Sequence, residues 1–138
     1  MVGKRPRKGR DKSSYINYFK KAKQFSEVMK RSYHEHNYDA AALNGIHAII
    51  SGIDAVLVFR HGVVSSSQNH EDAVGLLIEL IPEGAAQAKH ALAVIRKKSL
   101  VEYMDTLCNS SDALEIMKHT ERFLDWVKTK LPSNGNAV

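Results

Sequence analysis

The residue best suited to chemistry in this sequence is His70, within the stretch SSSQNHEDAVGLL over residues 65–77. It precedes Val74, Leu77 and Ile81 by four, seven and eleven residues, a spacing that places all four on one face of a helix. In the first turn of that helix, the dipole and partial burial both favour the uncharged imidazole. An uncharged imidazole can accept a proton, so His70 is a candidate general base.

A stripe of polar residues in the apolar segment 40–60 offers hydrogen-bond partners for His70. The stripe has a spacing of three, four and three residues and consists of Asn44, His47, Ser51 and Asp54. Polar groups that are buried in a helical bundle must be hydrogen-bonded to be tolerated. Two interpretations follow. The stripe either satisfies His70 in the core and fixes the packing register, or it lines a ligand-binding pocket together with His70.

The other polar residues around His70 are accounted for by the start of a helix. Ser67 or Asn69 can act as the N-cap, and Glu71 and Asp72 are first-turn acids, which the helix dipole favours. Asn69 also stands directly beside His70 in the chain, and it is therefore included among the candidate pocket residues.

Metal or cofactor chemistry is not expected. The single cysteine, Cys108, excludes a cysteine-rich zinc site, and His34 with His36 supplies too few ligands for four-coordinate zinc. His90 and His119 each stand alone on a predicted helix, where a solvated surface position explains them.

Apolar residues recur at helical spacing almost throughout the chain from residue 13 onward. Helices are predicted over about residues 13–33, 40–60, from the His70 stretch to 81, 83–98 and 110–131, with an irregular connection over 99–109. The second helix is apolar nearly all round, so it should be central. One of its faces carries only small residues: Ala41, Gly45, Ala48, Gly52 and Ala55. The fold class is therefore all-α, with a close helix–helix contact along this face.

Length and charge indicate a single domain with a basic N-terminus. A chain of 138 residues with 43% hydrophobic residues can bury one core. The net charge of +5 resides in residues 1–12, because the rest of the chain has 14 basic and 14 acidic residues. These twelve residues contain few apolar side chains, so we expect a disordered basic arm that either contacts nucleic-acid phosphates or only aids solubility. The folded domain should cover residues 13–131, and residues 132–138 should be a frayed end.

The second predicted helix approaches the roughly 20 residues of a membrane span. Its polar stripe, and Asp54 above all, would be costly in a bilayer, so no membrane association is expected. One cysteine and the lack of a charged-then-apolar leader favour a cytoplasmic protein.

Several features, taken in order along the chain, resemble the HEPN superfamily of small all-helical proteins. They are the segment YDAAALNGIHAIISGIDAVLVFRHG with His47 and Asp54, the serine-rich turn before NHEDAVGLL, and the segment VIRKKSLVEYMD with Tyr103. The resemblance covers about residues 13–131. It implies an up-and-down bundle of four to five helices that pairs as a homodimer.

The resemblance also implies a link to RNA or nucleotides. HEPN proteins include metal-independent RNA endonucleases, among them toxins of toxin–antitoxin pairs, and non-catalytic members that accompany nucleotidyltransferases. In the nucleases, an arginine holds the scissile phosphate and a histidine a few residues later handles protons. His70 would be that histidine, but the nearest arginine, Arg60, is separated from it by nine residues, more than in the family motif. The basic cluster Arg96, Lys97 and Lys98 could hold phosphate instead.

Three functions are therefore open. The favoured one is a nucleotide- or RNA-associated binding module, in partnership with a nucleotidyltransferase or an antitoxin. Its pocket would comprise Asn44, His47, Ser51, Asp54, Asn69, Lys97 and Tyr103. The second is a metal-independent ribonuclease with His70 as the base and Arg60 as the phosphate clamp. The third is a structural dimer that binds no ligand.

Overall fold

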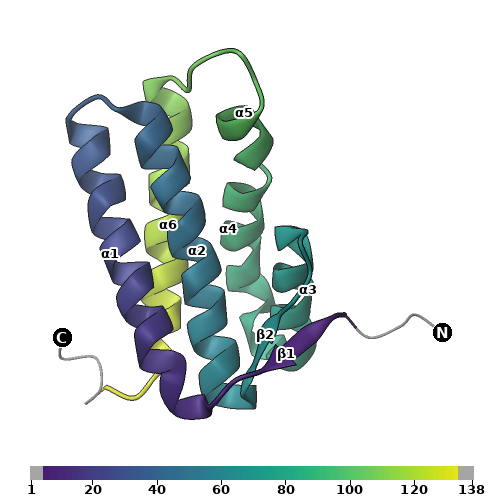
Figure 1. Cartoon of the computed structure of the whole chain (residues 1–138). Coiled ribbons are helices and arrows are strands. Elements are labelled where there is room, and N and C mark those ends of the chain that lie inside the picture. The colour runs from purple at the N-terminus through teal and green to yellow at the C-terminus, as the bar shows by residue number, and fades with distance from the viewer. Residues whose placement is uncertain (1–4, 134–138) are drawn as a thin grey trace.

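The computed structural model describes residues 5–133, and the predictions for residues 1–4 and 134–138 lie outside this range. Figure 1 shows long helices side by side, with a shorter helix and a two-stranded ribbon at one edge. The elements are β1 (Arg7–Gly9), a 3₁₀ turn (Lys12–Ser14), α1 (Tyr15–His34), α2 (Tyr38–His61), β2 (Val63–Ser65), α3 (His70–Leu80), a 3₁₀ turn (Pro82–Gly84), α4 (Ala85–Ile95), α5 (Lys98–Glu102) and α6 (Ser110–Thr129). The predicted all-α bundle is thus confirmed.

The helix α2 forms the centre of the bundle and packs against α1, α3, α4 and α6. Its small residues permit a close approach of α6. A Cβ atom on Gly45 would lie 2.7 Å from Ile116 Cγ2, and one on Gly52 would lie 2.8 Å from Leu124 Cδ2. By length and composition α2 could also cross a membrane, but 67% of its most apolar window is buried inside the bundle, as befits a core helix.

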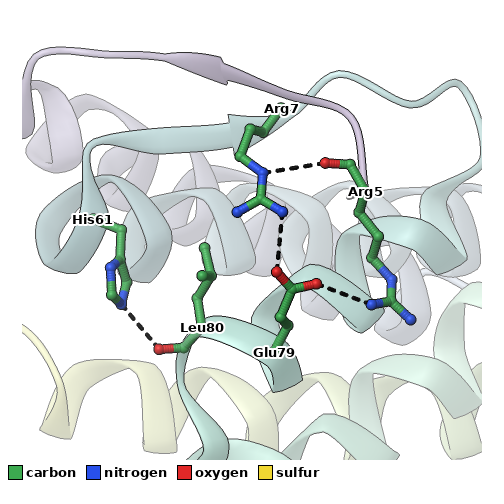
Figure 2. Close-up of polar contacts among 5 residues, drawn as sticks. All are labelled: Arg5, Arg7, His61, Glu79 and Leu80. Atoms are coloured by element: carbon green, nitrogen blue, oxygen red, sulfur yellow. Dashed lines mark hydrogen bonds and ion pairs between the residues drawn. The ribbon is translucent and has the colours of Figure 1, made fainter. Parts of the chain in front are cut away.

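The N-terminal segment is ordered from Arg5 onward, whereas the sequence predicted a disordered arm over residues 1–12. Strand β1 pairs antiparallel with β2. Arg5 and Arg7 both donate to the Glu79 carboxylate of α3, at 3.1 and 3.0 Å (Figure 2). The segment has too few apolar residues to form a core. Backbone pairing and two ion pairs to a carboxylate distant in the sequence hold it instead.

The helix predicted over residues 83–98 is shorter than expected, and this difference shapes the site. Pro82 begins a 3₁₀ turn that precedes α4, and α4 ends at Ile95. The short helix α5 follows, so the connection expected to be irregular is partly helical. The break between α4 and α5 places α5 beside the first turn of α3.

Candidate functional site

The helix start that carries His70 is built by local hydrogen bonds. Asn69 is the N-cap of α3, and its Oδ1 accepts a bond from the backbone N–H of Glu71 at 2.9 Å. Ser67 Oγ donates to the Asp72 carboxylate at 2.6 Å and accepts from the N–H of Asn69 at 3.1 Å. These bonds confirm the predicted N-cap, and they fix the first turn from which the His70 side chain projects.

His70 is half-buried and lies in an open pocket of about 220 Å³ between the start of α3 and the junction of α4 with α5. The pocket is lined by Gln68, Asn69, His70, Glu71, Ile95, Arg96, Lys98, Ser99 and Tyr103. Two basic side chains therefore share the pocket with the histidine. We call this site the His70 pocket.

The electrostatic surroundings of His70 favour its uncharged form. Burial lowers the pKa of His70, and the nearby Lys98 and His47 lower it further, while Glu102 acts in the opposite direction. No hydrogen bond within the described part of the chain engages its ring. An uncharged ring with free nitrogens can accept a proton or bind a ligand at neutral pH.

The two cations of the His70 pocket make surface ion pairs that a ligand could replace. Arg96 Nε lies 3.7 Å from Glu71 Oε1, with the arginine side chain 63% exposed. Lys98 Nζ lies 3.2 Å from Glu102 Oε1 and 5.9 Å from the centre of the Tyr103 ring. Exposed ion pairs contribute at most about 1 kcal/mol, so both groups can turn toward a bound anion at little cost.

The structure does not bring Arg60 to His70. Arg60 pairs with Glu83 at 3.2 Å, and its neighbour His61 is hydrogen-bonded to the carbonyl of Leu80, the last residue of α3. His70 is the first residue of that helix, and an 11-residue helix is about 16 Å long. Arg60 and His70 thus lie at opposite ends of α3, and the expected phosphate clamp is not assembled.

Lys97 is also directed away from the His70 pocket. Its Nζ lies 3.5 Å from Glu115 and 4.0 Å from Asp112, both in α6. Its neighbours Arg96 and Lys98 line the pocket instead. Tyr103, which the sequence included among the site residues, does line the pocket, with 74% of its surface exposed.

The polar stripe of α2 neither lines the pocket nor bonds to His70. The amide of Asn44 donates to the Ala40 carbonyl of its own helix at 2.8 Å. The His47 ring lies 5.3 Å from that of Phe25 in α1, and Ser51 is buried. Burial raises the pKa of Asp54 to about 7, although Arg10 and Lys21 act against the rise.

The remaining histidines are placed by structural contacts. His90 and His119, expected to be separate surface residues, face each other across α4 and α6 with 2.9 Å between their Nδ1 atoms. His36 Nδ1 lies 2.9 Å from the Tyr38 hydroxyl. Within residues 5–133, no three His, Cys, Asp or Glu side chains are grouped as metal ligands.

Four pocket residues, Gln68, Glu71, Ile95 and Ser99, were not among the site residues that the sequence suggested. Gln68 belongs to the serine-rich turn, and Ser99 to the stretch that was expected to be irregular. The sequence prediction extended the helix to residue 98 and so overlooked its end at Ile95. Once α4 stops there, the residues that follow turn back toward α3.

The fold and the site together define an all-helical domain with a histidine beside basic residues in an open pocket. A comparison with protein families matches residues 16–130 to the HEPN domain. The chain therefore belongs to the HEPN domain family, whose members have RNA-associated or nuclease-type functions in general. A search of curated proteins finds no match.

Proposed function

We propose that this chain is an RNA- or nucleotide-associated binding module and that the His70 pocket is its binding site. The observation that carries this proposal is the grouping of an unbonded imidazole, Arg96 and Lys98 around one open pocket. An arginine and a lysine suit a phosphate because charge-assisted hydrogen bonds to phosphate oxygens are about twice as strong as neutral ones.

The exposed aromatic ring at the rim supports the same function. Tyr103 is 74% exposed, and a base that stacks on such a ring gains about 1–3 kcal/mol. Asn69 and Ser99 add polar groups to the lining. A nucleotide has a base that can stack on Tyr103 and a phosphate that can reach Arg96 and Lys98.

Binding of a fluorescent single-stranded RNA, followed by anisotropy, tests the proposal. We expect Arg96→Ala and Lys98→Ala each to weaken binding by about tenfold, since a charge-assisted hydrogen bond contributes about 1.5 kcal/mol or more. Lys89→Ala and Lys118→Ala are matched controls because both lysines are exposed on α4 and α6. Equal affinities in the pocket variants and the controls would contradict this assignment of the site.

A metal-independent ribonuclease is the second candidate function, and the state of His70 supports it. Its ring is uncharged at neutral pH and faces an open pocket. It could therefore take the proton of a ribose 2′-hydroxyl while that oxygen attacks the neighbouring phosphorus. The bond from phosphorus to the 5′-oxygen breaks in the same step, and this oxygen leaves as a 5′-hydroxyl with a proton from water, so the products are a 2′,3′-cyclic phosphate and a 5′-hydroxyl end. Arg96 or Lys98, in place of Arg60, would stabilise the charge that develops on the phosphate.

Incubation of the protein with labelled RNA in a chelator separates the ribonuclease from the binding module. The ribonuclease requires cleavage that His70→Ala abolishes and that the exposed-residue control His34→Ala retains. Cleavage should persist below the ordinary histidine pKa of 6.5, because the pKa of His70 is lowered. Intact RNA with every variant would leave the binding module as the function.

The proposed module would act as a cytoplasmic homodimer and with a nucleotidyltransferase or an antitoxin as partner. Exposed apolar side chains near the α5–α6 connection, Tyr103, Met104 and Leu107, support a protein partner. Light scattering after gel filtration measures the oligomeric state, and co-purification from cells measures the partner. A monomer at all concentrations would overturn the homodimer. A dimer that binds neither nucleotides nor RNA would favour the purely structural function.

A further inference from the structure

The ordered N-terminal segment presents a row of cations on the surface. Glu79 forms ion pairs with both Arg5 and Arg7, and these pairs hold the segment against α3. The exposed cations that follow are Lys8, Arg10 and Lys12, and Lys21 of α1 joins them. We call these four residues the basic track.

The basic track lacks carboxylate partners. Among the residues that the structure describes, no carboxylate oxygen lies within 4 Å of any of the four charged groups. Elsewhere, cations with such a partner include Lys30, Arg60, Lys97, Lys98 and Lys130. In the same described part of the chain, other cations such as Lys20 and Lys118 also lack a carboxylate partner, but the basic track groups four exposed cations around β1, the 3₁₀ turn that follows it and the start of α1, with the single exposed acid Asp11 among them in the chain.

Tyr18 stands between two members of the basic track. Arg10 Nε donates to the Tyr18 hydroxyl at 3.2 Å, and Lys21 Nζ lies 5.8 Å from the centre of its ring. Asp54 of α2 is the acid whose charge acts on both cations. Its pKa of about 7 leaves this carboxyl partly uncharged at neutral pH, so the track keeps most of its positive charge.

The basic track leads toward the His70 pocket. The backbone N–H of Arg10 donates to the Gly62 carbonyl, directly before β2, and Lys8 lies opposite Val64 in the strand pair. From Val64 the chain needs six residues to reach His70, which span at most about 20 Å. Figure 1 shows the two strands passing beside α3, whose first turn carries the pocket.

We propose that the basic track binds the phosphodiester backbone of a single-stranded RNA while one nucleotide of the same strand occupies the His70 pocket. The inference rests on the proposed function and makes it narrower, because the ligand is then a strand and not a free nucleotide. Single-strand sites combine a basic path for the backbone with aromatic rings for the bases and cover about 4–16 nucleotides. Lys8, Arg10, Lys12 and Lys21 supply the path, and Tyr103 supplies an exposed ring.

The test compares an RNA of about ten nucleotides, within the usual range of single-strand sites, with a nucleoside monophosphate. The track variant carries Lys8→Ala, Lys12→Ala and Lys21→Ala, and it spares Arg10, which is bonded to Tyr18. The control carries Lys89→Ala, Lys118→Ala and Lys128→Ala, which remove the same charge from exposed positions of α4 and α6. Circular dichroism confirms that both variants are folded.

A plot of log affinity against log salt has a negative slope, and each phosphate contact of a single strand contributes about 0.7 to its size. The track variant removes three lysines, so we expect its slope to be smaller than that of the parent by about 2. Between about 50 and 200 mM salt, the affinity of the parent for RNA should then fall about 20-fold more than that of the track variant. Binding of the monophosphate should be equal in both. The control should keep the slope of the parent.

The alternative outcomes separate this inference from the proposed function. If the slope of the track variant equals that of the parent, the basic track does not bind RNA. The His70 pocket remains the proposed binding site in that case, provided that Arg96→Ala still weakens binding. If the parent binds neither RNA nor monophosphate, both proposals are overturned. If the parent binds phosphatidylserine vesicles through the track and leaves RNA unbound, the partner is a lipid surface and the inference is wrong.

Discussion

The carboxyl group of Asp54 offers a direct test of how α2 is packed. Burial raises its pKa from the ordinary 3.8 to about 7, although the charges of Arg10 and Lys21 oppose the rise. The folded protein therefore favours the uncharged acid up to about pH 7, whereas the unfolded chain ionises near the ordinary value. Ionisation opposes folding, so this group makes the folded state less stable as the pH rises between these two values.

The size of the effect follows from the displacement of the pKa. A rise of about three units corresponds to at most about 4 kcal/mol, because one unit is about 1.4 kcal/mol. The Asp54 side chain remains partly exposed, and solvent screening reduces the figure to about 2 kcal/mol. We expect Asp54→Asn to raise the free energy of unfolding by about 2 kcal/mol near pH 8, and by less than half of that near pH 5.

Urea unfolding of the parent and of Asp54→Asn, at both pH values, measures this difference. Using the difference between the two proteins cancels the titration of the seven histidines. Asp125→Asn is the matched control, since Asp125 is exposed on α6. The difference in unfolding free energy between this variant and the parent should be the same at both pH values. If Asp54→Asn is no more stable than the parent near pH 8, burial does not oppose the ionisation of Asp54 and α2 is packed differently around this carboxyl group.

Three further predictions concern the N-terminal segment, the contact of α2 with α6 and the start of α6. Glu79→Gln should leave the melting temperature nearly unchanged, since exposed ion pairs contribute at most about 1 kcal/mol each. It should nevertheless speed tryptic cleavage after Lys8, because the N-terminal segment loses its ion pairs with α3. Equal cleavage rates in parent and variant would show that these ion pairs do not hold the segment in place. Gly45→Ala should destabilise the fold by about 1–2 kcal/mol in urea unfolding, because the added methyl group would lie 2.7 Å from Ile116 Cγ2. Asn109→Ala should cost about 1 kcal/mol by removing the capping box of α6, and an unchanged midpoint would contradict that role.

The long helices could be predicted because their signals are local. Apolar residues at helical spacing and a capping residue such as Asn69 lie within a few turns of each other in the chain. The N-terminal segment could not be predicted in this way. The pairing of β1 with β2 joins residues 54 to 58 positions apart. The bonds from Arg5 and Arg7 to Glu79 join residues 74 and 72 positions apart, and the composition of the segment does not indicate such partners.

Side-chain periodicity along the chain is enough to predict the all-α class, the central place of α2 and the position of His70 at a helix start. The tertiary structure alone decided which groups surround His70. Arg96 and Lys98 reach it because α4 ends at Ile95 and α5 returns beside α3. Arg60, much closer in the sequence, lies at the far end of α3. The length of a rigid helix separates residues that are near in the chain, and the packing of a second helix brings distant ones together.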